Sequence, residues 1–270
     1  MQLAHELVAA PGATPTRAIA FLHGILGTGA NLRAHARRFV QARPDWLAVL
    51  VDLRAHGDSQ AREGPDTVEQ AALDVAQSTS ALAVPLEAVV GHSFGGKVAL
   101  QLALAAPTLG HVMTLDSAPG ARLDAHGSES TLAVLTLLEG LRGRVWPSRE
   151  AFVRELEAAG QSKGLSHWLA MNVKRTDAGY AFGLDLTRVH ALLDDYFALD
   201  LWSVVEHAAA DVHLVIGERS TVYSPEDRLR ANHLEADSHG RVTVDVLNAG
   251  HWVHVDDPEG VARVLLARLA

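Results

Sequence analysis

The chain of 270 residues contains no cysteine, and this absence excludes disulfide bonds, catalysis by a thiolate and metal sites built from cysteine. An excess of basic residues is also missing: 23 Lys and Arg accompany 32 Asp and Glu, which gives a formal net charge of −9. Binding to phosphates requires a basic face, so we expect no nucleic-acid partner.

Long apolar runs are absent as well. No run approaches the ~20 residues of a membrane-spanning helix, so we expect no membrane span. The N-terminal stretch MQLAHELVAAPGATP has no basic start followed by an apolar core, so we expect no signal peptide and a cytoplasmic location. With 48% hydrophobic and 20% charged residues, the composition is typical of a soluble globular protein.

Shorter apolar runs alternate with helical segments along the first half of the chain. Strands are predicted at 17–23, 46–53, 86–92 and 111–116, and helices at 32–41, 66–82 and 94–106. Continuous apolar strands that alternate with helices indicate a parallel sheet buried on both faces. Because crossovers between parallel strands are right-handed, the sequence predicts an open, doubly wound, mostly parallel α/β sheet.

The alternation is interrupted once. Residues from about 119 to 205 have helical segments but no clear strand, and the sheet pattern resumes with strands at 211–218 and 241–247 and a final helix from Asp257. We therefore predict one α/β domain over residues 1–270, with a helical cap inserted at about 119–205. The oligomeric state cannot be derived from this pattern.

A serine stands between a predicted strand and a predicted helix, in the sequence Gly91-His92-Ser93-Phe94-Gly95. This stretch fits the G-x-S-x-G pattern of a nucleophile elbow, a strained turn that exposes the serine hydroxyl above the strand ends. Small neighbours are needed there because strand and helix approach closely. The N-terminus of the following helix favours a developing negative charge beside the serine.

Four stretches together resemble the α/β-hydrolase family over nearly the whole chain: FLHGILG (21–27), VDLRAHGDS (51–59), GHSFGGKVAL (91–100) and NAGHWVHVDDPE (248–259). More narrowly, GHSFGGK, LDSAP (115–119) and AGHWVH in that order resemble the YbfF-type esterases and their mitochondrial relatives. The resemblance implies a catalytic triad in the chain order serine, acid, histidine.

The resemblance also implies where an oxyanion hole would lie. One donor would be the backbone N–H of Phe94, and the other the N–H of Ile25, with Leu26 as the alternative if the loop is shifted by one residue. His23 lies in the same loop, and we expect it to hold that loop through hydrogen bonds rather than to act as a base.

His251 is the predicted general base, since it follows the last strand in the loop that the fold brings over the elbow. His254 is the competing candidate, expected to be a packing or partly solvated residue. These histidines, with Asp256 and Asp257, show no recognisable metal-ligand spacing, so we expect no metal. Asp257 before Pro258 is expected to cap the last helix.

The triad acid is harder to place. In most relatives it follows the strand that here ends at Gly217, but this loop has Ser220 near the expected position, and a serine supplies no negative charge. Glu218 is one alternative. Asp116 is the other, because the carboxyl end of its strand lies at the same sheet edge as the elbow, and the YbfF-type resemblance places the acid there. Asp116 is preferred, and Glu218 remains open.

The substrate site is expected between cap and elbow. Trp168, Met171 and Asn172 lie on one helical run in the middle of the cap and are the predicted pocket residues. Arg54 follows a strand and is a candidate for binding an anionic substrate, although a structural hydrogen-bond network is the commoner role of such a loop.

The sequence therefore predicts a serine hydrolase that cleaves carboxylic or thio esters of small-to-medium acyl groups, with a small-molecule ester as its partner and no cofactor. The same triad also serves cofactor-free perhydrolases (haloperoxidases), C–C hydrolases and lyases, which remain alternatives. A non-catalytic ligand-binding protein is the alternative of a different class.

Overall fold

The computed structural model describes residues 2–61, 63–106, 108–122 and 129–269. Within them the main sheet has seven strands, in the spatial order β1-β3-β2-β4-β5-β8-β9. The strands are β1 (His5–Val8), β2 (Arg17–Leu22), β3 (Trp46–Val51), β4 (Leu86–His92), β5 (His111–Leu115), β8 (Asp211–Gly217) and β9 (Val242–Leu247). All neighbours pair in parallel except β1 with β3. The predicted mostly parallel α/β sheet is confirmed. The edge strand β1 was not predicted, since it is only four residues long.

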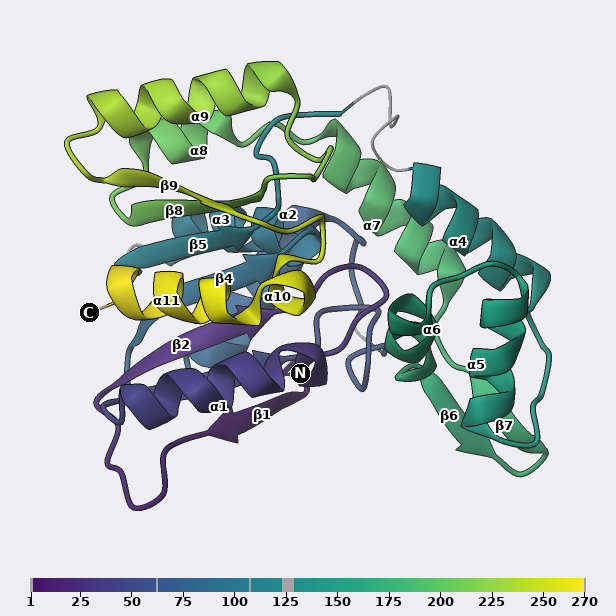
Figure 1. Ribbon diagram of the computed structural model, residues 1–270. Coiled ribbons are helices and arrows are strands. Elements are labelled where there is room, and N and C mark those ends of the chain that lie inside the picture. The colour runs from purple at the N-terminus through teal and green to yellow at the C-terminus, as the bar shows by residue number, and fades with distance from the viewer. Residues whose placement is uncertain (1, 62, 107, 123–128, 270) are drawn as a thin grey trace.

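Helices cover both faces of this sheet (Figure 1). Apolar side chains of α1 (Arg33–Ala42) and α11 (Pro258–Arg268) share one core cluster with one set of side chains from β2, β3 and β4. The alternate side chains of these strands share the other cluster with α2 (Val68–Thr79), α3 (Phe94–Ala105) and α8 (Trp202–His207). Burial on both faces explains why the strands are apolar throughout. Three further helices are η1 (Gly29–Leu32), α9 (Pro225–Asp237) and α10 (Val253–Asp256).

Residues 129–198, which lie between β5 and β8 in the sequence, stand beside the sheet, at the right of Figure 1. We call residues 129–198 the cap segment. It contains α4 (Glu129–Gly140), α5 (Arg149–Ala158), α6 (Lys163–Ala170), β6 (Val173–Thr176), β7 (Gly179–Phe182) and α7 (Leu186–Ala198). The expectation that this stretch has no strand is wrong, because β6 and β7 form an antiparallel hairpin. Its strands are four residues long and largely exposed or half-buried, so they lack the apolar run that marks the strands of the main sheet.

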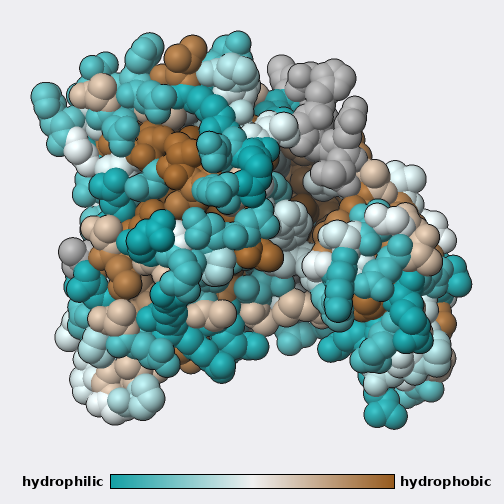
Figure 2. Space-filling model, in the orientation of Figure 1, coloured by the Kyte–Doolittle hydropathy of each residue, from teal (hydrophilic) through white to brown (hydrophobic). Residues whose placement is uncertain are grey.

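The surface is hollowed where the cap segment meets the rest of the chain, as Figure 2 shows. A cavity of about 570 Å³ lies between them, with Glu6 and Arg33 on one side and Met171 and Lys174 on the other. Among the described residues, no helix combines the length and the apolar character needed to cross a membrane.

Candidate active site

Ser93 lies on a strained turn between β4 and α3. Its backbone angles are φ 50° and ψ −116°, in a region that non-glycine residues rarely adopt. A Cβ atom on Gly91 would lie 2.0 Å from the Gly95 carbonyl oxygen, and one on Gly95 would lie 2.4 Å from the Leu22 carbonyl oxygen. The two glycines therefore let strand and helix approach closely enough for this turn to form.

Three side chains from distant parts of the sequence form a continuous chain of contacts at this turn. The Nε2 atom of His251 lies 3.1 Å from the hydroxyl oxygen of Ser93. The opposite ring nitrogen, Nδ1, lies 2.7 Å from Oδ2 of Asp116. In the tautomer that this arrangement favours, Nδ1–H donates to the carboxylate, and Nε2 is left to accept the serine proton.

The Asp116 carboxylate is fully buried, and protein groups hold both of its oxygens. Oδ1 accepts a hydrogen bond of 3.0 Å from the Gly217 N–H, and Oδ2 accepts the hydroxyl hydrogen of Ser220 in addition to that of His251. Burial of an ionised carboxylate is tolerated when such donors surround it. Glu218 is exposed, and among the described residues its side chain forms no hydrogen bond. The structure thus brings Asp116, and not Glu218, to His251.

Two further histidines pack beside His251. His92 donates its Nε2–H to the His251 carbonyl oxygen at 3.0 Å, and this bond connects the loop that carries His251 to the turn at Ser93. His254, the competing base, is 4% exposed, and its ring lies 4.4 Å from that of His92 between centroids. Burial lowers the pKa of His254 to about 3. His254 is a buried packing residue that has no contact with the Ser93 hydroxyl among the described hydrogen bonds.

Two backbone N–H groups lie at the cavities beside Ser93: that of Ile25, in the loop after β2, and that of Phe94, the first residue of α3. Neither the Ile25 N–H nor the Phe94 N–H has an acceptor among the described residues. The Leu26 N–H, by contrast, donates to Nε2 of His56 at 3.0 Å, so the alternative of Leu26 as an oxyanion donor is wrong. Ile25 and Phe94 both line cavities that include Ser93.

Two buried histidines hold this loop from opposite sides. His23 donates Nδ1–H to the Gly24 carbonyl oxygen and accepts the Leu53 N–H at Nε2. His56 likewise donates to the Arg54 carbonyl oxygen while it accepts the Leu26 N–H. Each ring must be neutral to accept, and burial lowers the pKa of His23 to about 4 and that of His56 to about 3. His23 therefore has the loop-holding contacts expected of it.

The three predicted pocket residues have different surroundings. Trp168 lines a cavity of about 140 Å³ next to Ser93. Met171 lies in the separate cavity between β6 and the main sheet, where its sulfur contacts the Asn31 side chain. Asn172 is buried and donates its side-chain N–H to the Leu26 carbonyl oxygen at 2.6 Å. The structure therefore corrects the prediction for Met171 and Asn172, because neither residue lines a cavity that includes Ser93.

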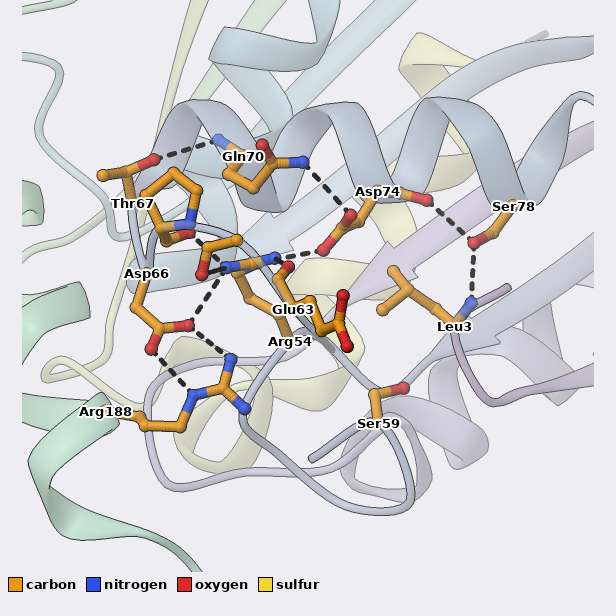
Figure 3. A network of polar contacts seen from close by, with 12 residues as sticks. Leu3, Arg54, Ser59, Glu63, Asp66, Thr67, Gln70, Asp74, Ser78 and Arg188 are labelled. Carbon is orange, nitrogen blue, oxygen red and sulfur yellow. Dashed lines mark hydrogen bonds and ion pairs between the residues drawn. The ribbon is translucent and has the colours of Figure 1, made fainter. Parts of the chain in front are cut away.

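Arg54 belongs to a buried polar network (Figure 3). Its guanidinium contacts Asp74 at 2.9 Å and Asp66 at 3.0 Å, and it also donates to backbone carbonyls of residues 63–65. Asp66 in turn accepts two hydrogen bonds from Arg188 on α7. Arg54 is fully buried, so its role is structural rather than substrate-binding.

The acids near the last helix also have structural contacts. Asp256 accepts the Gly250 N–H at 2.7 Å, and Asp257 caps α11 by accepting the Gly260 N–H, as expected of a residue before Pro258. No group of three or more metal-ligating side chains is assembled in the described part of the chain.

The comparisons with known proteins agree with this fold. A model of the alpha/beta hydrolase family matches residues 19–264, and the chain belongs to this family. It is 27% identical to a mouse protein named sn-1-specific diacylglycerol lipase ABHD11, over 94% of this chain and 81% of the relative. It is 25% identical to Esterase YbfF of Escherichia coli, over 92% of this chain and 91% of the relative. The resemblance to YbfF-type esterases is confirmed.

A third relative has a solved structure. Esterase Rv0045c of Mycobacterium tuberculosis is 30% identical over 92% of this chain and 80% of the relative. A crystal structure of that esterase matches with a TM-score of 0.69 at 26% identity, covering 100% of this chain and 92% of the other. The structural match extends to the cap segment, since the whole chain is covered.

Several residues of the site carried no signal that a single sequence reveals. His92 precedes the serine, but nothing in its position indicates that it would hold the His251 loop. The sequence showed only that Ser220 supplies no negative charge, whereas in the structure its hydroxyl donates a hydrogen bond to Asp116. His56 could be recognised only from the loop geometry that brings its ring to Leu26.

Proposed function

We propose that this protein hydrolyses carboxylic or thio esters of small-to-medium acyl groups through an acyl-enzyme on Ser93. The observation that carries the proposal is the contact chain from Ser93 through His251 to Asp116, beside two backbone N–H groups without acceptors among the described residues. Esterases and a lipase among the relatives support ester hydrolysis as the reaction class.

In the first half of the reaction, His251 accepts the Ser93 proton at Nε2 while the serine oxygen attacks the acyl carbonyl. Asp116 keeps the imidazole in the tautomer with hydrogen on Nδ1 and stabilises the cation that forms. The N–H groups of Ile25 and Phe94 donate to the oxyanion of the tetrahedral intermediate. The alcohol or thiol then leaves with the proton that His251 returns to it.

In the second half, water replaces the leaving group. His251 takes a proton from the water as it attacks the acyl-enzyme carbonyl, and the acid is released as the proton returns to the Ser93 oxygen. No step requires a cofactor, because serine, imidazole and carboxylate supply the nucleophile, the base and the stabilising charge.

The cavities around Ser93 support a small-to-medium acyl group. Two cavities include Ser93 and His251, and they measure about 170 and 140 Å³. Each is smaller than the ~300–1,000 Å³ typical of pockets for drug-sized ligands. The smaller one is lined by Leu165, Trp168 and Trp252, which suits an apolar chain.

The test is a chain-length series of p-nitrophenyl esters with wild type, Ser93→Ala, Asp116→Asn and Glu218→Gln. We expect Ser93→Ala and Asp116→Asn to lower kcat on the order of 10³–10⁴-fold, since the triad acts as a unit. Glu218→Gln, whose side chain is exposed, is the matched control and should retain wild-type kcat within about twofold.

Covalent labelling provides an independent check. A fluorophosphonate probe should label wild type at Ser93 and leave Ser93→Ala unlabelled. Absence of labelling in wild type would contradict the serine mechanism. If Asp116→Asn retained the wild-type kcat while Glu218→Gln lost it, Glu218 rather than Asp116 would be the triad acid.

A further inference from the structure

Ser93 borders two cavities whose linings differ in chemical character. The cavity of about 140 Å³ is lined by apolar side chains, including Val134, Leu169 and Trp252. The cavity of about 170 Å³ has Arg122 and Arg219 in its lining, together with hydroxyl-bearing and apolar side chains. Ile25, Ser93 and His251 line both, so the two cavities adjoin at the serine.

The two arginines reach this cavity from different elements. Arg122 follows β5, and its backbone N–H donates to the Phe197 carbonyl oxygen at 2.7 Å. Arg219 follows β8, where its backbone N–H donates to the Ala249 carbonyl oxygen at 2.9 Å. Both backbones are thus held by hydrogen bonds, and both residues line the same cavity beside Ser93.

Neither guanidinium forms an ion pair within the described part of the chain. Arg122 makes one long hydrogen bond of 3.5 Å to the Thr221 carbonyl oxygen, and Arg219 donates to the neutral amide oxygen of Asn248. Other arginines of the chain do pair with acids, as Arg54 does with Asp66 and Asp74. The side chains of Arg122 and Arg219 retain donors that no described carboxylate uses.

The described lining residues of this cavity include two arginines and no carboxylate, although the Asp116 carboxylate contacts two of them, Ser220 and His251. No Asp or Glu is among its described lining residues, although acidic residues outnumber basic ones 32 to 23 in the chain. Two cations that share one cavity repel each other, and an anion between them would gain charge-assisted hydrogen bonds from both. Guanidinium groups match the planar geometry of a carboxylate.

We propose that the substrate carries a carboxylate that binds between Arg122 and Arg219 while its ester carbonyl lies on Ser93. This inference rests on the proposed ester hydrolysis and narrows the substrate class to anionic esters or thioesters. The apolar cavity receives the other part of the molecule. The carboxylate belongs either to the acyl group or to the leaving group, and the two arms of the experiment below distinguish these sources.

The experiment compares kcat/KM for matched anionic and neutral esters. In the acyl arm, mono-p-nitrophenyl adipate is paired with p-nitrophenyl hexanoate. In the leaving-group arm, 3-carboxyphenyl butyrate is paired with 3-carbamoylphenyl butyrate, with phenol release followed by chromatography. The proteins are wild type, Arg122→Gln, Arg219→Gln, the double variant and Arg37→Gln. Arg37 is an exposed arginine on α1 and serves as the control for loss of one positive charge.

The readout is the ratio of anionic to neutral kcat/KM within each protein, so the amount of correctly folded enzyme cancels. We expect the double variant to lower this ratio at least tenfold in one of the two arms, because two charge-assisted hydrogen bonds are lost. Arg37→Gln should leave it within twofold. A decrease of less than tenfold in both arms overturns the proposal.

Failure of this inference can be separated from failure of the proposed function. If wild type turns over the neutral esters in a Ser93-dependent manner but the ratio stays unshifted, ester hydrolysis stands and the carboxylate site is wrong. If no ester of either arm is cleaved in a Ser93-dependent manner, the proposed function itself is wrong.

Discussion

The hydroxyl of Ser220 contacts the buried Asp116 carboxylate, a role that its position in the sequence did not indicate. It lies in the loop after β8, where the sequence resemblance led us to look for the triad acid, and it donates its hydroxyl hydrogen to Oδ2 of Asp116. Oδ2 also accepts from His251, so both donors orient the same oxygen. A carboxylate held by several donors keeps a fixed direction toward the imidazole. Ser220 is therefore a positioning residue for Asp116.

Replacement of this hydroxyl should impair the site without removing the charge. We expect Ser220→Ala to lower kcat on the order of 10- to 100-fold, since loss of a hydrogen bond to a charged group costs about 1.5–3 kcal/mol. Ser220→Thr retains the hydroxyl and is the matched control. Steady-state kinetics with p-nitrophenyl butyrate measure both. Equal kcat in wild type and Ser220→Ala would show that Asp116 needs no such support.

At the scale of elements, buried cations connect the cap segment to the sheet. Lys97 on α3 is fully buried and donates to the carbonyl oxygens of Gly120, Tyr196 and Leu199 at 2.6–2.8 Å. These carbonyls belong to the chain leaving the sheet after β5 and to the end of α7. Lys97 therefore connects α3 with the end of the cap segment.

The network of Figure 3 provides a second connection, through Asp66, which lies between Arg54 and Arg188. We expect Arg54→Met to lower the free energy of unfolding by about 3–5 kcal/mol, because it removes the fully buried guanidinium that faces Asp74 and Asp66. Arg188→Gln should cost about 1–2 kcal/mol, since its site is partly exposed and glutamine keeps a donor.

Urea unfolding of both variants measures this difference. Each variant should unfold with the m value of wild type, so that a change in Cm reports a change in the free energy of unfolding. A larger loss in Arg188→Gln than in Arg54→Met would contradict the structural role assigned to Arg54.

At the scale of the whole molecule, buried histidines make stability depend on pH. Burial is the main cause that lowers the pKa of six of them: His23 and His213 to about 4, His56 and His254 to about 3, His92 well below its ordinary value, and His35 to a smaller extent. In the unfolded chain these rings take up protons near pH 6.5. The folded state then binds fewer protons than the unfolded state.

Stability should therefore be greatest above pH 6.5 and fall as the pH decreases toward 4. Each such histidine contributes a loss of about 1.4 kcal/mol per pH unit once the pH is below 6.5. Urea unfolding at pH 7.5, 6.5 and 5.5 measures the slope. This range lies above the ordinary pKa values of carboxyl groups, so it isolates the histidines. A free energy of unfolding that stays constant from pH 7.5 to 5.5 would refute the linkage.

The sequence by itself determined the features that local patterns encode. Apolar runs fixed the strands of the parallel sheet, and the glycines around Ser93 indicated the elbow, because strand burial and turn geometry depend on near neighbours in the chain. Short or exposed strands such as β1, β6 and β7 lacked this signal. The preference for His251 followed from its place after the last strand.

Tertiary structure alone decided which side chains meet. Asp116 and His251 are 135 residues apart, and only the strand order and the loop paths bring the carboxylate, rather than Glu218, to the imidazole. The same holds for Asn172, which donates to the Leu26 carbonyl oxygen, and for Arg122 and Arg219, which line one cavity. Such contacts depend on register and packing across the whole fold, which residue spacing does not encode.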